Sequence, residues 1–225
     1  MAESDLTFIK VYNEVTGQAW SMFDSDVGSE DEFEKSVTTS IQKALSALWN
    51  SYKFPFRYKT AKIKTKVGST EYYIPAGNIS KKTVKHNKVY DVVCNKKYLE
   101  YNPDIELLEE KVGEPEAFCK KSGKIVIYPT PDAIYEVKVG YLSFNTACDD
   151  DGISKANLEV EDDYIDIDEE YQDLFLKALM PLAMTYLIAS EQDENYSSYK
   201  KQYDVAYKNL LDFCKGVEKD KTIGW

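Results

Sequence analysis

KIVIYPTPDAIYEVKVGYLS, residues 124–143, is the stretch of this sequence that decides the fold. Residues 125–128 form a β-branched and aromatic run. Pro129 and Pro131 end that run, because proline cannot donate to a strand ladder. Residues 135–141 then alternate between apolar or aromatic side chains and others, which is the period of a half-buried strand. We therefore expect a β-hairpin here, with its turn outside the sheet.

Helices are predicted towards the N-terminus. Ser29 and Glu32 form a capping box, and apolar residues recur every three or four positions behind it, so we expect a helix over residues 30–51. Before it, apolar residues between positions 6 and 15 predict a shorter helix, which Gly17 interrupts.

A lysine-rich β block follows that long helix. Residues 57–67 and 71–74 predict two strands joined by a tight turn at Gly68, and residues 83–93 predict at least one more. Residues 103–110 favour a short helix. Since the connections are short, we expect a sheet of five or six mostly antiparallel strands, completed by the hairpin.

An acidic stretch and two helices end the chain. Residues 144–168 are interpreted as a loop, with a possible edge strand near its end. From Glu169 an apolar face recurs with helical spacing. We expect the last helix over residues 193–216, with Gly216 as its cap.

Tyrosines follow one side of this last helix, and two large apolar residues lie in the tail. Packing against the preceding helix explains the tyrosine stripe, and an interface with another protein is the sharper hypothesis, since tyrosine suits half-wet surfaces. The tail is either a frayed end or a docking segment. The candidate partner-interface residues are Tyr196, Tyr199, Tyr203, Tyr207, Ile223 and Trp225.

These elements predict an α+β protein. An antiparallel β-sheet domain, residues 55–168 with the acidic linker, is inserted between an N-terminal helix and a C-terminal helix pair. The helical domain accordingly consists of residues 1–54 and 169–225.

Much of the common catalytic repertoire is missing from the sequence. His86 is the only histidine, which excludes zinc sites that need two imidazoles. The four cysteines include no Cys-x-x-Cys pair, and we interpret them as reduced thiols. Neither common glycine-rich phosphate loop occurs. We predict no catalytic, cofactor-binding or metal-ligating residues, no membrane span and no secretory signal.

Charge is unevenly distributed along the chain. Residues 51–101 hold twelve basic and three acidic residues, a local charge of +9. Residues 149–170 hold eleven acidic residues against Lys155, a local charge of −10. This asymmetry favours surfaces that meet different neighbours. Arg57 is the only arginine, and this argues against dedicated nucleic-acid recognition, which relies on arginine.

The order of these elements resembles the head–tail adaptor, or tubular tail ("gatekeeper"), proteins of short-tailed bacteriophages. The resemblance covers residues 36–213. Its landmarks are loose patterns of tyrosine, proline and apolar positions: Leu48-Trp49, Phe54-Pro55-Phe56, Glu71-Tyr72-Tyr73-Ile74-Pro75 and residues 125–132. The single arginine and the long acidic linker have no counterpart in the family pattern.

The resemblance implies a structural virion protein at the head–tail junction. Such a protein is in the host cytoplasm during assembly and catalyses no reaction. It implies a homo-oligomeric ring, commonly of twelve copies, that contacts the portal protein and downstream tail or ring proteins. DNA would leave through the channel without specific binding. A ring of one chain needs two different faces on each subunit, which the separate basic and acidic regions provide. An acidic channel lining would repel DNA, so residues 149–170 are a candidate for that position.

Two other functions are compatible with particular residues. The lysine-rich block makes a nucleic-acid-binding module the main alternative, with base stacking on Tyr58, Tyr72, Tyr73 and Tyr90. A hydrolase with paired carboxylates, for example Asp163 and Asp166, is the other hypothesis, since such pairs work when their pKa values differ.

Overall fold

The computed structural model describes residues 6–20, 22, 30–73, 88–121, 124–151, 154–188 and 194–223, with the backbone alone at position 88 and over 218–223. The chain divides into two compact units. The helical unit comprises Met1–Phe56 and Asn145–Trp225, and the β unit comprises Arg57–Phe144. The fold is α+β, with mostly antiparallel sheets inserted between N-terminal helices and a C-terminal helix pair, which confirms the predicted class.

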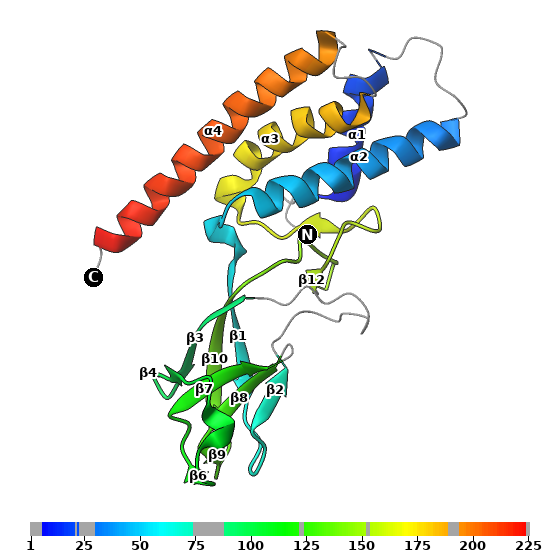
Figure 1. The fold of residues 1–225 in the computed structure, drawn as a ribbon. Helices are drawn as coiled ribbons and strands as arrows, with labels where there is room; N and C mark the ends of the chain where they lie inside the picture. The colour runs from blue at the N-terminus through cyan, green and yellow to red at the C-terminus, as the bar shows by residue number, and fades with distance from the viewer. Residues whose placement is uncertain are drawn as a thin grey trace. The chain divides into compact units, whose positions relative to one another are not determined.

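In the helical unit, α3 (Glu169–Leu187) contacts the other three helices, α1 (Phe8–Trp20), α2 (Glu30–Ser51) and α4 (Glu194–Ile223). Figure 1 shows α3 in yellow beside the long orange-red α4. Residues 178–185 of α3 are all buried, so this helix is covered on every side along those two turns. Such all-round burial is typical of a central core helix.

Aromatic side chains fill the core of the helical unit. The rings of Phe54 and Phe56 are stacked with centroids 5.0 Å apart, and the ring of Trp49 lies 5.3 Å from Phe56. Phe175 and Tyr171 of α3 meet Phe56 edge-on, at 5.6 Å and 5.2 Å. All five side chains are at most 1% exposed. The Phe-Pro-Phe segment after α2 is therefore a core element of this unit.

Two predicted helix ends are wrong. Helix α1 continues through Gly17 to Trp20, and α4 continues through Gly216 to Ile223. A glycine inside a helix costs only about 1 kcal/mol relative to alanine. The apolar contacts of α1 with α2 and α3 outweigh this cost. The predicted capping residue Ser29 lies outside the described residues, as do residues 189–193 between α3 and α4.

The acidic stretch was expected to be a loop of the β-rich domain with an edge strand near its end. The edge strand is present, but it belongs to a small sheet, and the stretch is part of the helical unit. A small antiparallel sheet forms there, in which β11 (Ala147–Cys148) pairs with β12 (Ser154–Lys155) and β13 (Tyr164–Ile165). Ala147 and Ile165 are fully buried in the core of the helical unit. The boundary between the two units therefore lies near residue 145, because these apolar side chains pack with the helices.

The described residues of the β unit form two four-stranded sheets and a two-stranded ribbon. The first sheet has the order β1-β10-β3-β4, and the second has the order β2-β8-β7-β5. The expected helix at 103–110 is a single 3₁₀ turn, η2 (Ile105–Leu107). The strands are β1 (Tyr58–Lys64), β2 (Glu71–Tyr73), β3 (Lys88–Cys94), β4 (Lys97–Tyr98), β5 (Glu100–Tyr101), β6 (Val112–Gly113), β7 (Ala117–Lys121), β8 (Lys124–Tyr128), β9 (Thr130–Pro131) and β10 (Glu136–Leu142).

The core of the β unit combines residues from both four-stranded sheets. Val92, Val137 and Val139 of the first sheet cluster with Ile125 and Ile127 of the second, and each is at most 1% exposed. The two sheets therefore pack face to face, as in a β-sandwich.

The predicted hairpin at 124–143 is wrong, although both of its strands exist. β8 pairs with β2 and β7, whereas β10 pairs with β1 and β3 in the other sheet. The proline-containing segment between them includes β9, which pairs with β6. The chain thus crosses from one sheet to the other, so that Ile127 and Val137 bury their side chains in the same core.

The predicted pairing of residues 57–67 with 71–74 is wrong for the same reason, since β1 and β2 belong to different sheets. Their connection runs beside the β8–β10 connection, and the Gly68 amide donates to the Pro131 carbonyl at 2.9 Å. Gly68 has φ +76°, a conformation that side chains rarely adopt. Two adjacent crossings therefore link the sheets at this end of the sandwich.

Candidate interaction surfaces

The predicted tyrosine stripe lies on α4, and most of it faces the helical core. Tyr199, Tyr203 and Tyr207 are half-buried and pack against that core, and burial raises the pKa values of Tyr199 and Tyr203. The rings of Tyr203 and Tyr207 are stacked, with centroids 5.5 Å apart. Tyr196 is half-buried as well, one turn nearer the start of the helix. Contact of these residues with a partner stays a prediction, and packing accounts for part of the stripe.

The candidate docking tail is described only in part. The backbone of Ile223 ends α4, and Trp225 lies outside the described residues. Leu210 and Cys214 are the last fully buried side chains described on α4.

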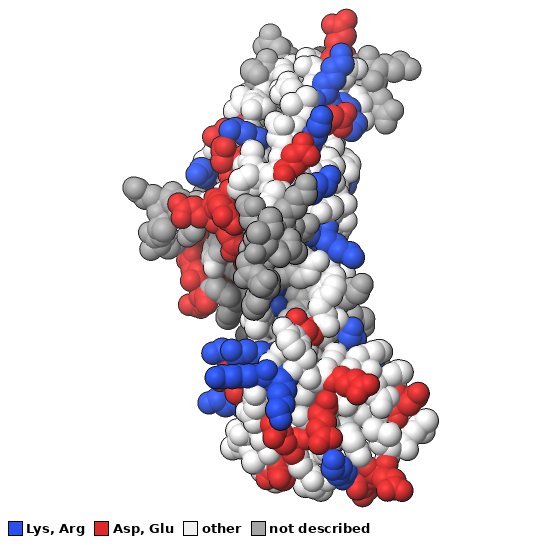
Figure 2. Space-filling view, turned by 90° about the vertical axis from the view of Figure 1, so that its left-hand side faces the viewer, with Lys and Arg blue, Asp and Glu red and all other residues white. Residues whose placement is uncertain are grey.

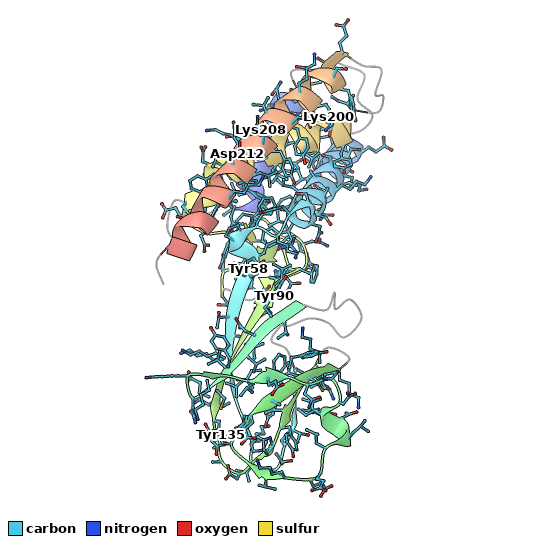
Figure 3. All side chains as sticks on the ribbon, turned by 60° about the vertical axis from the view of Figure 1, so that its left-hand side comes forward. Tyr58, Tyr90, Tyr135, Lys200, Lys208 and Asp212 are labelled. Atoms are coloured by element: carbon cyan, nitrogen blue, oxygen red, sulfur yellow. The ribbon has the colours of Figure 1, made fainter. Side chains whose placement is uncertain are left out.

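Beside the stripe, α3 and α4 enclose a shallow apolar groove of about 380 Å³. Its lining includes Leu174 of α3 and Val205 of α4, which is 63% exposed. The sequence does not reveal this groove, because the position of Val205 in the helical repeat does not show which part of α4 is left uncovered by α3. Lys200, Lys208 and Asp212 lie along α4 (Figure 3), and Lys200 pairs with Asp204 at 2.6 Å, as on a solvated helix face.

The acidic segment, defined here as residues 149–170, is organised around Asp163. The Asp163 carboxylate is fully buried and accepts a 2.7 Å bond from Lys155 Nζ at Oδ1. Its Oδ2 accepts hydrogen bonds from the backbone amides of Glu159 and Val160, at 2.6 Å and 3.0 Å. Burial alone would raise the pKa of Asp163, but these donors outweigh burial and lower it. Asp163 is therefore held ionised, whereas an acid catalyst needs a raised pKa.

The other carboxylates of the acidic segment mostly face solvent. In the described part of this segment, the structure contains one ion pair, between Lys155 and Asp163. Eight acidic residues are exposed: Asp150, Asp151, Glu159, Glu161, Asp162, Asp168, Glu169 and Glu170. The segment therefore presents a largely uncompensated negative surface.

Lysines line the outer face of the β1-β10-β3-β4 sheet. The side chains of Lys62 and Lys64 on β1 and of Lys138 on β10 alternate with inward-facing residues and are exposed. We call these three residues the lysine face. Register places Lys62 directly opposite Lys138. The sequence showed an excess of lysine in this region, but the strand register was needed to identify which lysines meet.

Aromatic residues flank the lysine face. Tyr58 and Tyr90 lie with ring centroids 5.2 Å apart and are 46% and 38% exposed. Figure 3 shows both at one end of the β unit, away from Tyr135. A bulge in β3 makes this possible: Val89 and Val92 both face the core, so Tyr90 and Asp91 both point outwards. Arg57 is buried beside them, and its Nε donates to the Ser143 carbonyl at 3.1 Å.

The remaining stacking candidates have different positions. Tyr72 is buried, and its hydroxyl contacts the turn before β2: it accepts the Lys66 amide at 2.9 Å and donates to the Ser69 carbonyl at 2.6 Å. Tyr73 is 75% exposed, and Lys124 Nζ lies 5.1 Å from its ring centroid. The four tyrosines therefore do not form one platform, and only Tyr58 and Tyr90 are adjacent.

The two units carry opposite net charges. The β unit has sixteen basic and eleven acidic residues, a net charge of +5, whereas the helical unit has twelve and twenty-eight, a net charge of −16. Figure 2 shows a group of basic side chains gathered on one part of the β unit. One polypeptide thus offers surfaces of both signs.

Within the described ranges, no group of three His, Cys, Asp or Glu side chains is arranged to hold a metal ion. His86 lies outside those ranges. Of the helices that the structure describes, none combines the length and apolar character that a membrane crossing requires. A search against models of known protein families gives no match, and neither does a search of the curated proteins.

Proposed function

We propose that this chain is a structural subunit of a bacteriophage head–tail connector. In this role it forms a homo-oligomeric ring, commonly of twelve copies, between the portal protein and the next tail or ring protein. DNA passes through the ring without specific binding, and the subunit catalyses no reaction and needs no cofactor. It acts in the virion at the head–tail junction, after assembly in the host cytoplasm.

The observation that carries this proposal is the order of the elements. A helical unit is interrupted after Phe54-Pro55-Phe56 by a β unit and is completed by the α3–α4 pair. The resemblance to head–tail adaptors rests on this order and on the tyrosine and proline landmarks within it. Phe54 and Phe56 are core residues, and the Tyr72 hydroxyl accepts a hydrogen bond from the Lys66 amide in the turn before β2. Most of these landmarks are therefore residues that determine the fold.

The charge distribution supports the same proposal. A closed ring made from one chain uses heterologous contacts, in which one face of each subunit meets a different face of the next. Units of net charge +5 and −16 supply two such faces, and complementary charge fixes the register of neighbours.

Mass spectrometry of purified phage particles tests the proposal. We expect the chain in mature particles, at a copy number equal to that of the portal protein, and imaging of the neck should show it as a ring. Its absence from mature particles, or enzymatic activity of the isolated subunit, would refute the connector role.

A nucleic-acid-binding module is the second candidate, and one observation favours it. Tyr58 and Tyr90 form an exposed aromatic pair on the sheet that carries the lysine face, and stacking platforms in single-strand binders combine these features. Its test is binding of single-stranded DNA at increasing salt. A steep loss of affinity between low and moderate salt supports it, and no binding at low salt eliminates it.

A further inference from the structure

The lysine face has more cations than the isolated subunit pairs with carboxylates. Lys62 and Lys138 occupy directly opposite positions on antiparallel strands, and both point outwards. Like charges at such positions repel each other. Glu136, which lies opposite Lys64 in the register, forms an ion pair with Lys62 at 3.8 Å, and both side chains of that pair are at least half exposed.

Two carboxylates, Glu136 and Asp91, point outwards from the same sheet and leave the three lysines with an excess of one positive charge. In the part of the chain that the structure describes, Lys64 and Lys138 have no carboxylate within ion-pairing distance. By contrast, Lys121 and Lys124 of the second sheet are paired with Glu106 and Glu71. Of the four lysines compared here, the two without an ion pair lie on the first sheet, and an anionic partner would reduce the repulsion among the lysines of that sheet.

We propose that the lysine face docks on the acidic segment of a second copy of this chain. The inference rests on the proposed ring and names the contact between its neighbouring subunits. The lysine face has three cations and the acidic segment has eight exposed carboxylates, of which Glu159, Glu161 and Asp162 are close together in sequence. Each exposed pair contributes little alone, but several at one surface determine which faces meet.

A second copy fits this face better than DNA does. At long range the net charge of −11 repels DNA and another copy of the chain alike, so local contacts decide between them. The lysine face contains no arginine, the side chain that binds phosphate through two parallel hydrogen bonds. DNA binding to this face is therefore an outcome of the test, and it would overturn the proposal.

Carbodiimide cross-linking of mixed ¹⁴N- and ¹⁵N-labelled full-length protein tests the contact. The reagent joins lysines directly to carboxylates, and mixed-isotope peptides identify links between copies. At high protein concentration and low salt, we expect links from Lys62, Lys64 or Lys138 to the acidic segment. Because a Lys62→Gln, Lys64→Glu, Lys138→Glu variant lacks the reacting amines, its effect is measured as association of the copies by sedimentation equilibrium. The association constant should fall by at least about tenfold, since opposing charges are lost.

Two further variants make the result specific. A reciprocal variant, Glu159→Lys, Glu161→Lys and Asp162→Lys, should also associate poorly alone, and mixing it with the lysine-face variant should restore association. A matched control reverses exposed lysines of the helical unit, Lys10→Glu, Lys35→Glu and Lys43→Glu, and should associate as the unaltered protein does. Circular dichroism establishes that each variant is folded.

Three results would overturn the proposal: no links between copies, links that avoid the lysine face, or an association constant that the lysine-face variant leaves unchanged. Salt-sensitive DNA retention that this variant abolishes would overturn it as well. These outcomes differ from failure of the connector role, which is decided by whether mature particles contain the chain. A ring built through other surfaces leaves that role intact.

Discussion

Lys155 Nζ donates a 2.7 Å hydrogen bond to Oδ1 of Asp163, whose side chain is completely removed from solvent. The backbone carbonyl of Asp163 accepts the Phe8 amide at 2.7 Å, at the start of α1. One residue therefore links the acidic segment, the small β11–β13 sheet and the first helix. Its acidic neighbours face solvent, so Asp163 differs from them in role although the sequence shows one uniform run.

Replacing Asp163 should destabilise the helical unit. Asp163→Ala leaves two backbone amides and the Lys155 ammonium without their acceptor, at a cost of about 2–3 kcal/mol in the free energy of unfolding. Urea denaturation followed by circular dichroism measures this change. Asp162→Ala is the matched control, because Asp162 is exposed, and it should change stability by less than about 0.5 kcal/mol. Equal effects of the two substitutions would contradict the assigned role.

The contribution of Asp163 should depend on pH in a defined direction. Its donors lower the folded-state pKa below the unfolded value of about 3.9. The unfolded state therefore binds the proton more tightly, and the stabilisation is present above about pH 4 and is lost as pH falls through the folded-state pKa. The stability difference between the unaltered protein and Asp163→Asn should be constant from about pH 5 to 7 and shrink below pH 4. A difference that grows on acidification would show that the pKa is raised.

Tyr72 and Tyr73 are adjacent in sequence, and we expect their hydroxyl groups to differ in importance. Tyr72→Phe leaves the Lys66 amide and the Ser69 carbonyl of a partly buried turn without this partner, so unfolding should become easier by about 1–2 kcal/mol. Tyr73→Phe is the matched control, since Tyr73 is 75% exposed, and should be neutral. Thermal unfolding of both variants measures the difference in their stability. A neutral Tyr72→Phe would mean that water replaces the lost hydroxyl at no cost.

Periodicity predicted the elements of the fold better than their pairing. The strand at 135–141 and the helix at 30–51 have strong local patterns, and both exist close to the expected bounds. The hairpin between 124 and 143 was wrong because local sequence does not reveal whether a proline-containing connection turns back or crosses to another sheet. Both solutions bury Ile127 and Val137, and only the packing of the two sheets decides between them.

The same limit applies to the candidate interaction surfaces. Local composition revealed the positive block and the acidic segment, because charge counts need no pairing information. It could not show that Lys62 and Lys138 are opposite each other or that Asp163 is buried among exposed acids. The tyrosine stripe of α4 had the right spacing for both packing and partner binding. The tyrosines of this stripe that are half-buried show that part of the helix face packs against the helical core.

Deleting residues 217–225 should weaken docking of the subunit to a neighbouring ring and leave the helical unit folded. The last fully buried side chains described on α4 are Leu210 and Cys214, so the deletion removes none of them, and stability should change by less than about 0.5 kcal/mol. Deleting residues 210–225 is the contrasting variant. It removes both buried side chains and should cost at least about 2 kcal/mol. Urea denaturation measures stability, and incorporation into tail-less particles measures docking. Full incorporation of the shorter deletion would show that Ile223 and Trp225 contact no partner that matters for assembly.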